Sequence, residues 1–355
     1  MGSVGRAERL IELASGIDAL YFTAMCALPT PLLEDLKSAQ REARERSEPS
    51  RLLLGAESFR VGERGRNRYR FMLQHSNGEI LFTDSEKLPP IYVQPRARFI
   101  HAVGIDSAMR WFMDLVESMV GEASWRVSRA DLFMDSHGWE LCAEDRSRFV
   151  CRARDLRTWE VDSTLTGLGF GSGKTVSARI YDKTKEVRLK GSDWWTEVWG
   201  SAYVKSERVL RVEFQLRRDL IRQVGLDSPD DVITEASQLW AYLTDEWLSF
   251  RNPTSDDTRS RWPVASEWND VRNASLRGAA IGLDRVYAGE QAGSMRKLLP
   301  ALRGYLASAG AIVGAATLDE TLSRVGRIVA RDAEDSAIPF EQRLGWKAEQ
   351  LGIAS

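Results

Sequence analysis

Three stretches of the chain alternate between apolar and polar residues, and their polar positions carry groups that could act on a phosphate. Such alternation is typical of β-strands with one buried and one solvated face. The polar positions are Arg129, Asp131 and Asp135 in 127–135; Arg179, Tyr181 and Lys183 in 176–183; and Arg211, Glu213 and Arg217 in 209–217. If the three strands are neighbours in a half-buried sheet, their charged faces bring a tyrosine, guanidinium groups and carboxylates together.

Tyr181 lies two residues from a cation on each side, Arg179 and Lys183. A phenol has a reference pKa of about 10, so it needs positive neighbours to approach the nucleophilic phenolate. Guanidinium groups match phosphate in a bidentate manner and stay charged. Five arginines crowd the short segment 208–222, which includes the third stretch: Arg208, Arg211, Arg217, Arg218 and Arg222. This combination indicates phosphoryl transfer with Tyr181 as the nucleophile.

The carboxylates Asp131, Asp135 and Glu213 offer oxygen ligands, which select a hard divalent ion such as Mg²⁺ or Mn²⁺. Asp131 and Glu213 could share an ion, because opposite residues on adjacent strands lie about 5 Å apart. Asp135 lies about 13 Å from Asp131 along one strand, so both can bind one ion only if the strand ends or bends between them. The alternative is a solvated face of arginine–carboxylate pairs, each worth under about 1 kcal/mol.

Two other patterns argue against common function classes. The stretch 169–175 resembles a phosphate-binding P-loop, but Leu168 stands where that motif needs its first glycine, and a strand is expected where the motif needs a helix. We therefore expect 164–173 to be a glycine-rich turn. The histidines His75, His101 and His137 are scattered, which disfavours a zinc hydrolase.

The composition is that of an ordinary globular protein, with 355 residues, 43% hydrophobic, 28% charged and a net charge of −2. Any contact with nucleic acid must therefore come from a local patch. Three cysteines without a Cys-x-x-Cys spacing suit a reducing cytosol. The chain opens without a signal-peptide pattern, and its longest apolar run, 305–316, is too short to span a bilayer. We expect a cytoplasmic protein with no membrane partner.

These features predict an α+β protein. Two β-lobes, 1–120 and 121–228, are expected to form a strongly curved, mostly antiparallel sheet with flanking helices, followed by a helical C-terminal region, 229–355. The other expected elements are helices at 4–15, 31–46, 108–120 and 144–157, a strand at 17–26, a hairpin turning at 76–78, an extended segment at 91–103 and a wholly helical tail at 276–330. Four aromatic residues could stack on bases or fill the core: Trp194, Trp195, Trp199 and Tyr203.

The chain resembles the Rep_trans family, the replication initiation factors of rolling-circle plasmids and the related relaxases of integrative conjugative elements. The resemblance spans about 127–270, and its most specific part is Arg179-Ile-Tyr-Asp-Lys183. The other matching passages are Arg129-Ala-Asp131-Leu-Phe-Met-Asp135, Gly169-Phe-Gly-Ser172, Glu186, Arg211-Val-Glu213, and Arg261-Trp-Pro263 with Trp268.

The resemblance implies a DNA strand transferase that nicks one strand at an origin through a 5′-phosphotyrosine link and later rejoins the ends. Carried over by position, Tyr181 is the nucleophile, and Asp131 with Glu213 hold a divalent metal, Asp135 being the less certain ligand. Three cations would stabilise the charged phosphorane: Lys183, Arg179 and Arg211. We expect DNA contacts from Arg129, Arg217, Arg218 and Lys174.

The expected partners are single-stranded or cruciform origin DNA, with a host helicase and a second copy of the chain as further candidates. The alternative function is a DNA-binding protein of the same fold without catalysis. The joint presence of Tyr181, Asp131 and Glu213 argues against that alternative, because a pure binder has no use for carboxylates that face phosphate.

Overall fold

The structure is a computed structural model that describes residues 9–276, 302, 306–334, 339–342 and 344. The chain divides into two compact units. The first comprises 1–54 and 58–285, and the second comprises 55–57 and 286–355. Both predicted β-lobes belong to the first unit and share one sheet, while the lobe boundaries themselves stay a prediction. In the second unit, α12 (Leu318–Glu334) is a helix.

The first unit is built on one eleven-stranded sheet in the order β2-β3-β4-β5-β6-β1-β7-β12-β11-β10-β9. Every pairing whose register is defined among the described residues is antiparallel. The strands are β1 (Ile11–Met25), β2 (Ser50–Leu54), β3 (Glu57–Val61), β4 (Phe71–Gln74), β5 (Gly78–Phe82), β6 (Ile91–Pro95), β7 (Ser124–His137), β9 (Leu156–Val161), β10 (Thr164–Phe170), β11 (Val176–Asp182) and β12 (Leu210–Arg217). A second, two-stranded sheet pairs β8 (Phe149–Cys151) with β13 (Leu248–Phe250).

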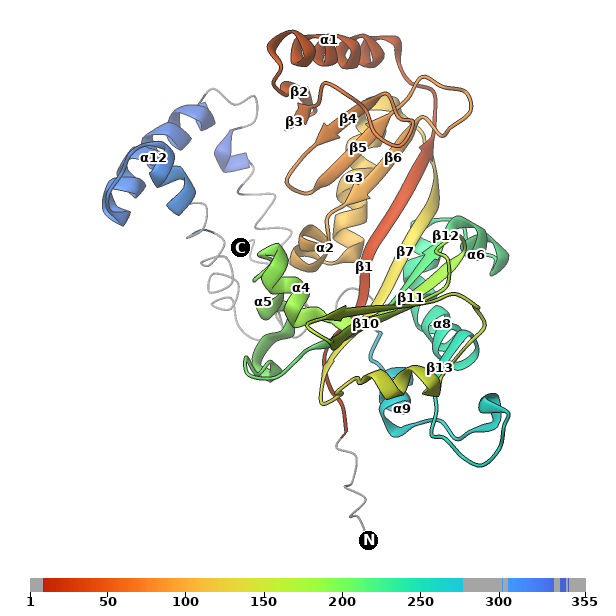
Figure 1. The fold of residues 1–355 in the computed structure, drawn as a ribbon. Helices are drawn as coiled ribbons and strands as arrows, with labels where there is room; N and C mark the ends of the chain where they lie inside the picture. The colour runs from red at the N-terminus through yellow and green to blue at the C-terminus, as the bar shows by residue number, and fades with distance from the viewer. Residues whose placement is uncertain (1–8, 277–301, 303–305, 335–338, 343, 345–355) are drawn as a thin grey trace. The chain divides into compact units, whose positions relative to one another are not determined.

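Two long strands, β1 and β7, run side by side through the middle of the large sheet (Figure 1). Their register shifts three times, and one shift falls between Ile17 and Ala19. Asp18 is therefore an extra residue in β1, a β-bulge, and a bulge re-aims the side chain it carries. This irregularity places the carboxylate of Asp18 within a strand whose neighbouring residues are mostly apolar.

The predicted alternation in the three strands β7, β11 and β12 is confirmed. One face buries Ala130, Leu132, Met134, Ile180, Val212 and Phe214 in the main hydrophobic core. The opposite face carries the charged set, and the register places Glu213 between Phe133 of β7 and Arg179 of β11. Tyr181 lies opposite Arg211, which in turn lies opposite Asp135.

Helices cover the core face, while the charged face is only partly covered. On the core face, α3 and α8 pack through apolar side chains such as Phe112 and Trp240. On the charged face, α4 and α5 build a small second cluster in which Phe133 contacts Trp195, with ring centroids 5.6 Å apart. The helices of the first unit are α1 (Thr30–Arg46), α2 (Ala97–Val103), α3 (Ile105–Val120), α4 (Lys183–Lys190), α5 (Trp195–Trp199), α6 (Arg218–Gln223), α7 (Pro229–Thr234), α8 (Ala236–Tyr242) and α9 (Ser266–Arg272).

Four expectations for individual elements are wrong. Residues 11–15 belong to strand β1 rather than to a helix, and 4–8 lie outside the described residues. The segment 91–103 is extended only to Pro95 and then forms helix α2. Residues 144–157 contain most of a 3-10 helix, the whole of β8 and the start of β9. The expected glycine-rich turn at 164–173 is mostly strand β10, which ends at Phe170. Much of the expected helical tail, 277–301 and 303–305, lies outside the described residues.

The fold is α+β, with one large antiparallel sheet and flanking helices, as predicted from the sequence. The strong curvature expected for the sheet stays a prediction. No helix in the described part of the chain is long and apolar enough to cross a membrane.

Candidate active site

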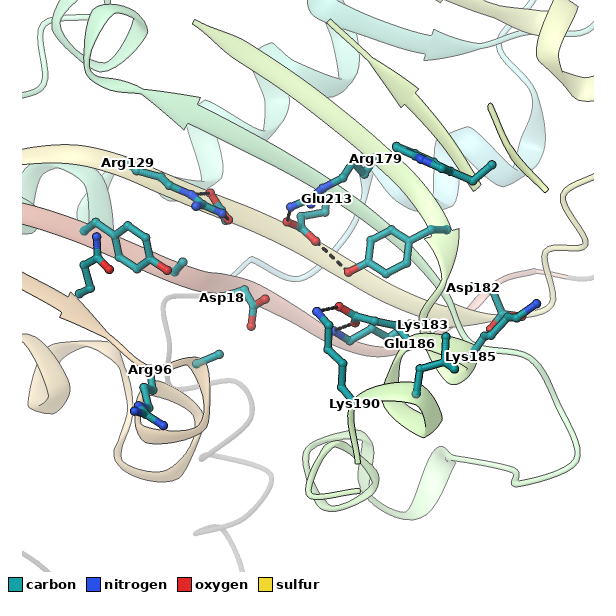
Figure 2. Close-up of a pocket in the computed structure, with 18 of the residues that line it drawn as sticks. Asp18, Arg96, Arg129, Arg179, Asp182, Lys183, Lys185, Glu186, Lys190 and Glu213 are labelled. Atoms are coloured by element: carbon teal, nitrogen blue, oxygen red, sulfur yellow. Dashed lines mark hydrogen bonds and ion pairs between the residues drawn. The ribbon is translucent and has the colours of Figure 1, made fainter. Parts of the chain in front are cut away.

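A pocket of about 780 Å³ opens on the charged face of the sheet. Its walls come from two halves of the sheet, a first half within residues 1–120 and a second half within 121–228. Strands β1 and β7 pair with each other and so join the two halves. Figure 2 shows ten of its polar residues from both sides, including Asp18, Arg96, Arg179 and Glu213. From the second half it is lined by Arg129, Asp131, Arg179, Tyr181, Lys183 and Glu213, and from the first by Asp18, Tyr21, Arg66, Glu79, Gln94 and Arg96.

Tyr181 is bound to Glu213 inside this pocket. The phenol donates a hydrogen bond of 2.9 Å to Oε2 of Glu213 (Figure 2). The guanidinium of Arg179 donates to the other oxygen, Oε1. Glu213 is 4% exposed, so one buried carboxylate holds both the tyrosine and a cation. The sequence grouped these three residues, and the structure joins them directly.

The environment keeps the Tyr181 phenol protonated. Burial raises its pKa well above 10, and the negative charge of Glu213 raises it further, while Arg211 acts in the opposite direction. A phenolate here would have to share a buried region with a carboxylate. The tyrosine therefore needs a proton acceptor to become a nucleophile, and Glu213 already accepts its hydrogen bond.

Asp131 lines the same pocket and forms an ion pair with Arg129, on its own strand. Burial raises the pKa of Asp131 to about 6, and the nearby charge of Glu213 adds to this effect, against the lowering by Arg129. An added positive charge would stabilise the ionised form of Asp131 in this site.

Lys183 begins helix α4 at the rim of this cluster. Asp182 caps the helix by accepting a 2.9 Å hydrogen bond from the backbone N–H of Lys185. The ammonium of Lys183 donates to Glu186 and lies 4.6 Å from the ring centroid of Trp195. Burial and the nearby Arg211 lower its pKa. The strand-to-helix junction thus fixes a cation next to the tyrosine.

Arg211 and Asp135 lie beneath the pocket rather than in it. Both side chains are 0% exposed, and Arg211 binds Asp135 in a bidentate manner at 2.6 and 2.7 Å. Trp199 donates a further 2.8 Å hydrogen bond to Asp135. The expectation that Asp135 is a metal ligand is not supported by its placement, because Asp135 is fully buried and does not line the pocket.

Arg211 connects this buried pair to the pocket. Its guanidinium donates a 3.0 Å hydrogen bond to Asp18, whose other oxygen lies 3.1 Å from Nε2 of His101. Burial alone would raise the pKa of Asp18, but Arg211 and His101 outweigh it and hold the pKa well below the usual range. The guanidinium carbon lies 4.1 Å from the ring centroid of Phe133 and 4.2 Å from that of Trp195. Arg211 is thus a buried organising residue, not a group that a phosphate can reach.

The predicted DNA-binding residues divide in the same way. Arg129 lines the pocket, whereas Arg217, Arg218 and Lys174 do not. Arg218 binds Asp227 and the backbone oxygens of Val127 and Asp227, so it holds the start of α6 against β7.

The four aromatic residues proposed for base stacking are mainly core. Trp195 and Trp199 are 2% exposed, and Trp194 and Tyr203 pack against the same cluster. The tryptophan that does line the pocket is Trp159, on the edge strand β9. Sequence reasoning did not single it out, because an isolated aromatic residue in a polar strand carries no pattern.

Three further pocket residues were also missed as site residues. Asp18 is a single carboxylate in an apolar strand, and the bulge that aims it is not visible in the alternation. Glu186 binds both Lys183 and Lys190. Its place three residues after Lys183 predicts their contact on a helix, and Glu186 also belongs to the passages that resemble the family. Arg96 follows β6 directly, in the half of the sheet for which no chemistry was expected.

The divalent metal that the sequence suggests fits part of this site. Within the described residues, no three His, Cys, Asp or Glu side chains are placed to hold an ion together. Asp131 and Glu213 nevertheless supply the hard oxygen donors that Mg²⁺ or Mn²⁺ prefers, and both line the same pocket. These two residues, without Asp135, are the pair that fits the ion.

No protein-family model and no curated protein matches the chain. Among solved structures, it is similar to a rolling-circle replication initiator protein from Geobacillus stearothermophilus. The alignment has 16% sequence identity, covers 75% of this chain and 98% of the other, and gives a TM-score of 0.46.

Proposed function

We propose that this protein nicks one DNA strand through a 5′-phosphotyrosine intermediate and later rejoins strands, as the replication initiator or relaxase of a mobile element. The observation that carries the proposal is the hydrogen bond from Tyr181 to Glu213 in a pocket that also presents cations. A tyrosine bound to its own proton acceptor is the arrangement that nucleophilic catalysis requires. The Arg-Ile-Tyr-Asp-Lys passage, which resembles the Rep_trans family, supports the same reading.

In the proposed reaction, the phenol oxygen of Tyr181 attacks the scissile phosphorus while its proton passes to Glu213. The bond from phosphorus to the 3′ oxygen breaks, and that oxygen leaves as a hydroxyl after it takes up a proton. The phosphodiester energy is kept in the new phosphotyrosine bond, so a 3′-hydroxyl can attack it and reseal a strand without ATP.

Cations around the tyrosine stabilise the extra negative charge of the pentavalent phosphorane. Arg179, whose side chain is 43% exposed, and Arg129, whose side chain is 21% exposed, can reach a bound phosphate. Lys183 contributes charge from the start of α4. Arg211 acts only through Asp18 and Asp135, as a positioning residue.

Asp131 and Glu213 would hold the divalent ion, Mg²⁺ or Mn²⁺. When bound there, the ion supplies Lewis-acid stabilisation to the scissile phosphate. The substrate is single-stranded or cruciform origin DNA, a host helicase is the partner that would extend the unwound region, and the protein acts in the cytoplasm, as a single copy or as a homodimer.

The test is to incubate the protein with Mn²⁺ and single-stranded oligonucleotides from its own replicon, and then to look for a covalent adduct on a denaturing gel. The proposal predicts an adduct that disappears on addition of EDTA and in the Tyr181→Phe variant. Binding without any adduct across all origin oligonucleotides would contradict it and favour the non-catalytic DNA-binding protein.

A further inference from the structure

One tryptophan differs from all the others that the structure describes. Trp159 is 43% exposed, whereas the remaining described tryptophans are buried or half-buried. It lines the same pocket as Tyr181, together with Thr166. An indole that keeps a large apolar surface open inside a polar pocket is a candidate for contact with a ligand's ring.

Two glycines of β10, Gly167 and Gly169, leave room for this indole on the strand. A Cβ on Gly169 would lie 2.6 Å from Cη2 of Trp159, and a Cβ on Gly167 would lie 3.3 Å from its Cε3. One side of the ring therefore lies directly against the bare backbone of β10. These glycines explain why strand β10 has no recognisable strand pattern in the sequence.

The backbone of Trp159 is also held in place. The hydroxyl of Thr166 donates a 3.1 Å hydrogen bond to the carbonyl of Trp159, and the register shift between Leu165 and Gly167 makes Thr166 a bulge. The hairpin closes through Asp162 and Ser163, with φ of 51° and 58°, as a tight two-residue turn requires. A platform fixed before binding loses little entropy when it binds.

The register gives the position of the platform relative to the nucleophile. Trp159 lies opposite Gly167, and Gly167 lies opposite Tyr181. Trp159 and Tyr181 are therefore in one row across the sheet, two strand spacings or about 10 Å apart, with no side chain on the glycine between them. A nucleotide whose phosphate lies at Tyr181 would place its neighbouring base over this row.

We propose that Trp159 is the stacking platform for the unpaired base next to the phosphate that Tyr181 attacks. This inference rests on the proposed function. Because every base has a π-face, stacking of this kind tolerates any sequence. Trp159 thus sets the position of the strand relative to the nucleophile rather than reading the origin sequence.

The experiment uses the Tyr181→Phe variant, which keeps the strand uncleaved, and single-stranded oligonucleotides with 2-aminopurine at one position at a time around the nick site. We expect quenched fluorescence at one or two adjacent positions. Adding Trp159→Ala should abolish that local quenching and weaken binding by about 5- to 150-fold. Trp159→Phe should retain most of both signals, because it keeps a ring.

Two variants serve as controls. Leu189→Ala removes apolar surface from the same pocket, where Leu189 is 79% exposed. This variant should not change the quenching at the 2-aminopurine position that is quenched in the parent protein. Trp159→Leu covers the glycines without offering an aromatic face, and it replaces the alanine variant if that variant does not fold.

The outcomes separate this inference from the proposed function. If quenching and affinity are the same in Trp159→Ala and Trp159→Leu as in the parent, the platform is refuted, even where wild-type protein forms the covalent adduct. If quenching depends on Trp159 but no adduct forms with Mn²⁺, the platform is supported and the catalytic proposal fails.

Discussion

The phenol of Tyr181 and the carboxylate of Glu213 meet diagonally across two strands. In the register of the sheet, Tyr181 lies opposite Arg211 and Glu213 lies opposite Arg179, yet the hydrogen bond of 2.9 Å joins Tyr181 to Glu213. The carboxylate of Glu213 thus accepts a hydrogen bond from Tyr181, its diagonal neighbour, and forms an ion pair with Arg179, which lies directly opposite. This geometry gives the proposed nucleophile a proton acceptor without any histidine.

Replacing Tyr181 by phenylalanine removes one oxygen and keeps the ring. We expect loss of detectable strand cleavage, with DNA affinity within about twofold of the wild type. Glu213 keeps its ion pair with Arg179 but loses the hydrogen bond from Tyr181, so the free energy of unfolding should fall by about 1–3 kcal/mol. Cleavage on a denaturing gel and binding by fluorescence anisotropy check the two parts. Residual covalent adduct would identify another tyrosine as the nucleophile.

Asp131 should make the metal-free protein less stable as the pH rises. Its folded-state pKa is raised from 3.8 to about 6, so the folded protein binds this proton more tightly than the unfolded chain does. The stabilisation is complete below about pH 4 and is lost as the pH rises through about 6, a change of up to about 3 kcal/mol. Urea unfolding in EDTA from pH 4 to 8 measures it. The Asp131→Asn variant should lack this component, and an identical pH profile in both proteins would contradict the assignment.

The Asp135–Arg211 pair should contribute to stability far more than a surface pair. Removing one partner leaves a charge buried and unpaired, so Arg211→Ala should lower the free energy of unfolding by about 3–5 kcal/mol. The matched control is Arg46→Ala, which breaks an exposed pair with Glu42 and should cost under about 1 kcal/mol. Equal effects in chemical unfolding would show that Arg211 is not the buried organiser described above.

Arg96, at the edge of the pocket in the first half of the sheet, should contact the DNA backbone. Arg96→Ala should weaken binding of single-stranded DNA and reduce the salt dependence by about one phosphate contact. Arg222→Ala removes the same charge from an exposed position on α6 that does not line the pocket. A salt series of binding titrations compares the two, and equal slopes would show that the strand does not cross the first half.

The placement of the candidate site residues could be predicted where the strands are regular. The alternation in β7, β11 and β12 assigned Tyr181, Glu213 and Asp131 to one face, because a period of two fixes the face of every residue in an unbroken strand. Asp135, expected as a metal ligand, and Arg211, expected to stabilise the phosphorane, do not line the pocket. Both share that face, but α5 covers it there, and Trp199 binds Asp135.

The rest depended on features that alternation does not encode. Asp18 reaches the pocket through a bulge in β1, and a bulge shifts the pattern without any sequence signature of its own. Strand β10 looked like a turn because glycine is depleted in strands. A Cβ on Gly169 would collide with Trp159, and a Cβ on Gly167 would collide first with Tyr181 and then with Trp159. The intrinsic secondary-structure propensity of a residue is overridden where a site needs a particular shape.

The most direct test is to identify the residue that becomes linked to DNA. Wild-type protein is incubated with Mn²⁺ and a single-stranded origin oligonucleotide, the adduct is digested with protease and nuclease, and the modified peptide is sequenced by mass spectrometry. The account predicts a nucleotide attached to Tyr181, within the peptide that carries Ile180 and Asp182. A nucleotide on any other residue, or an adduct that persists in Tyr181→Phe, would contradict it.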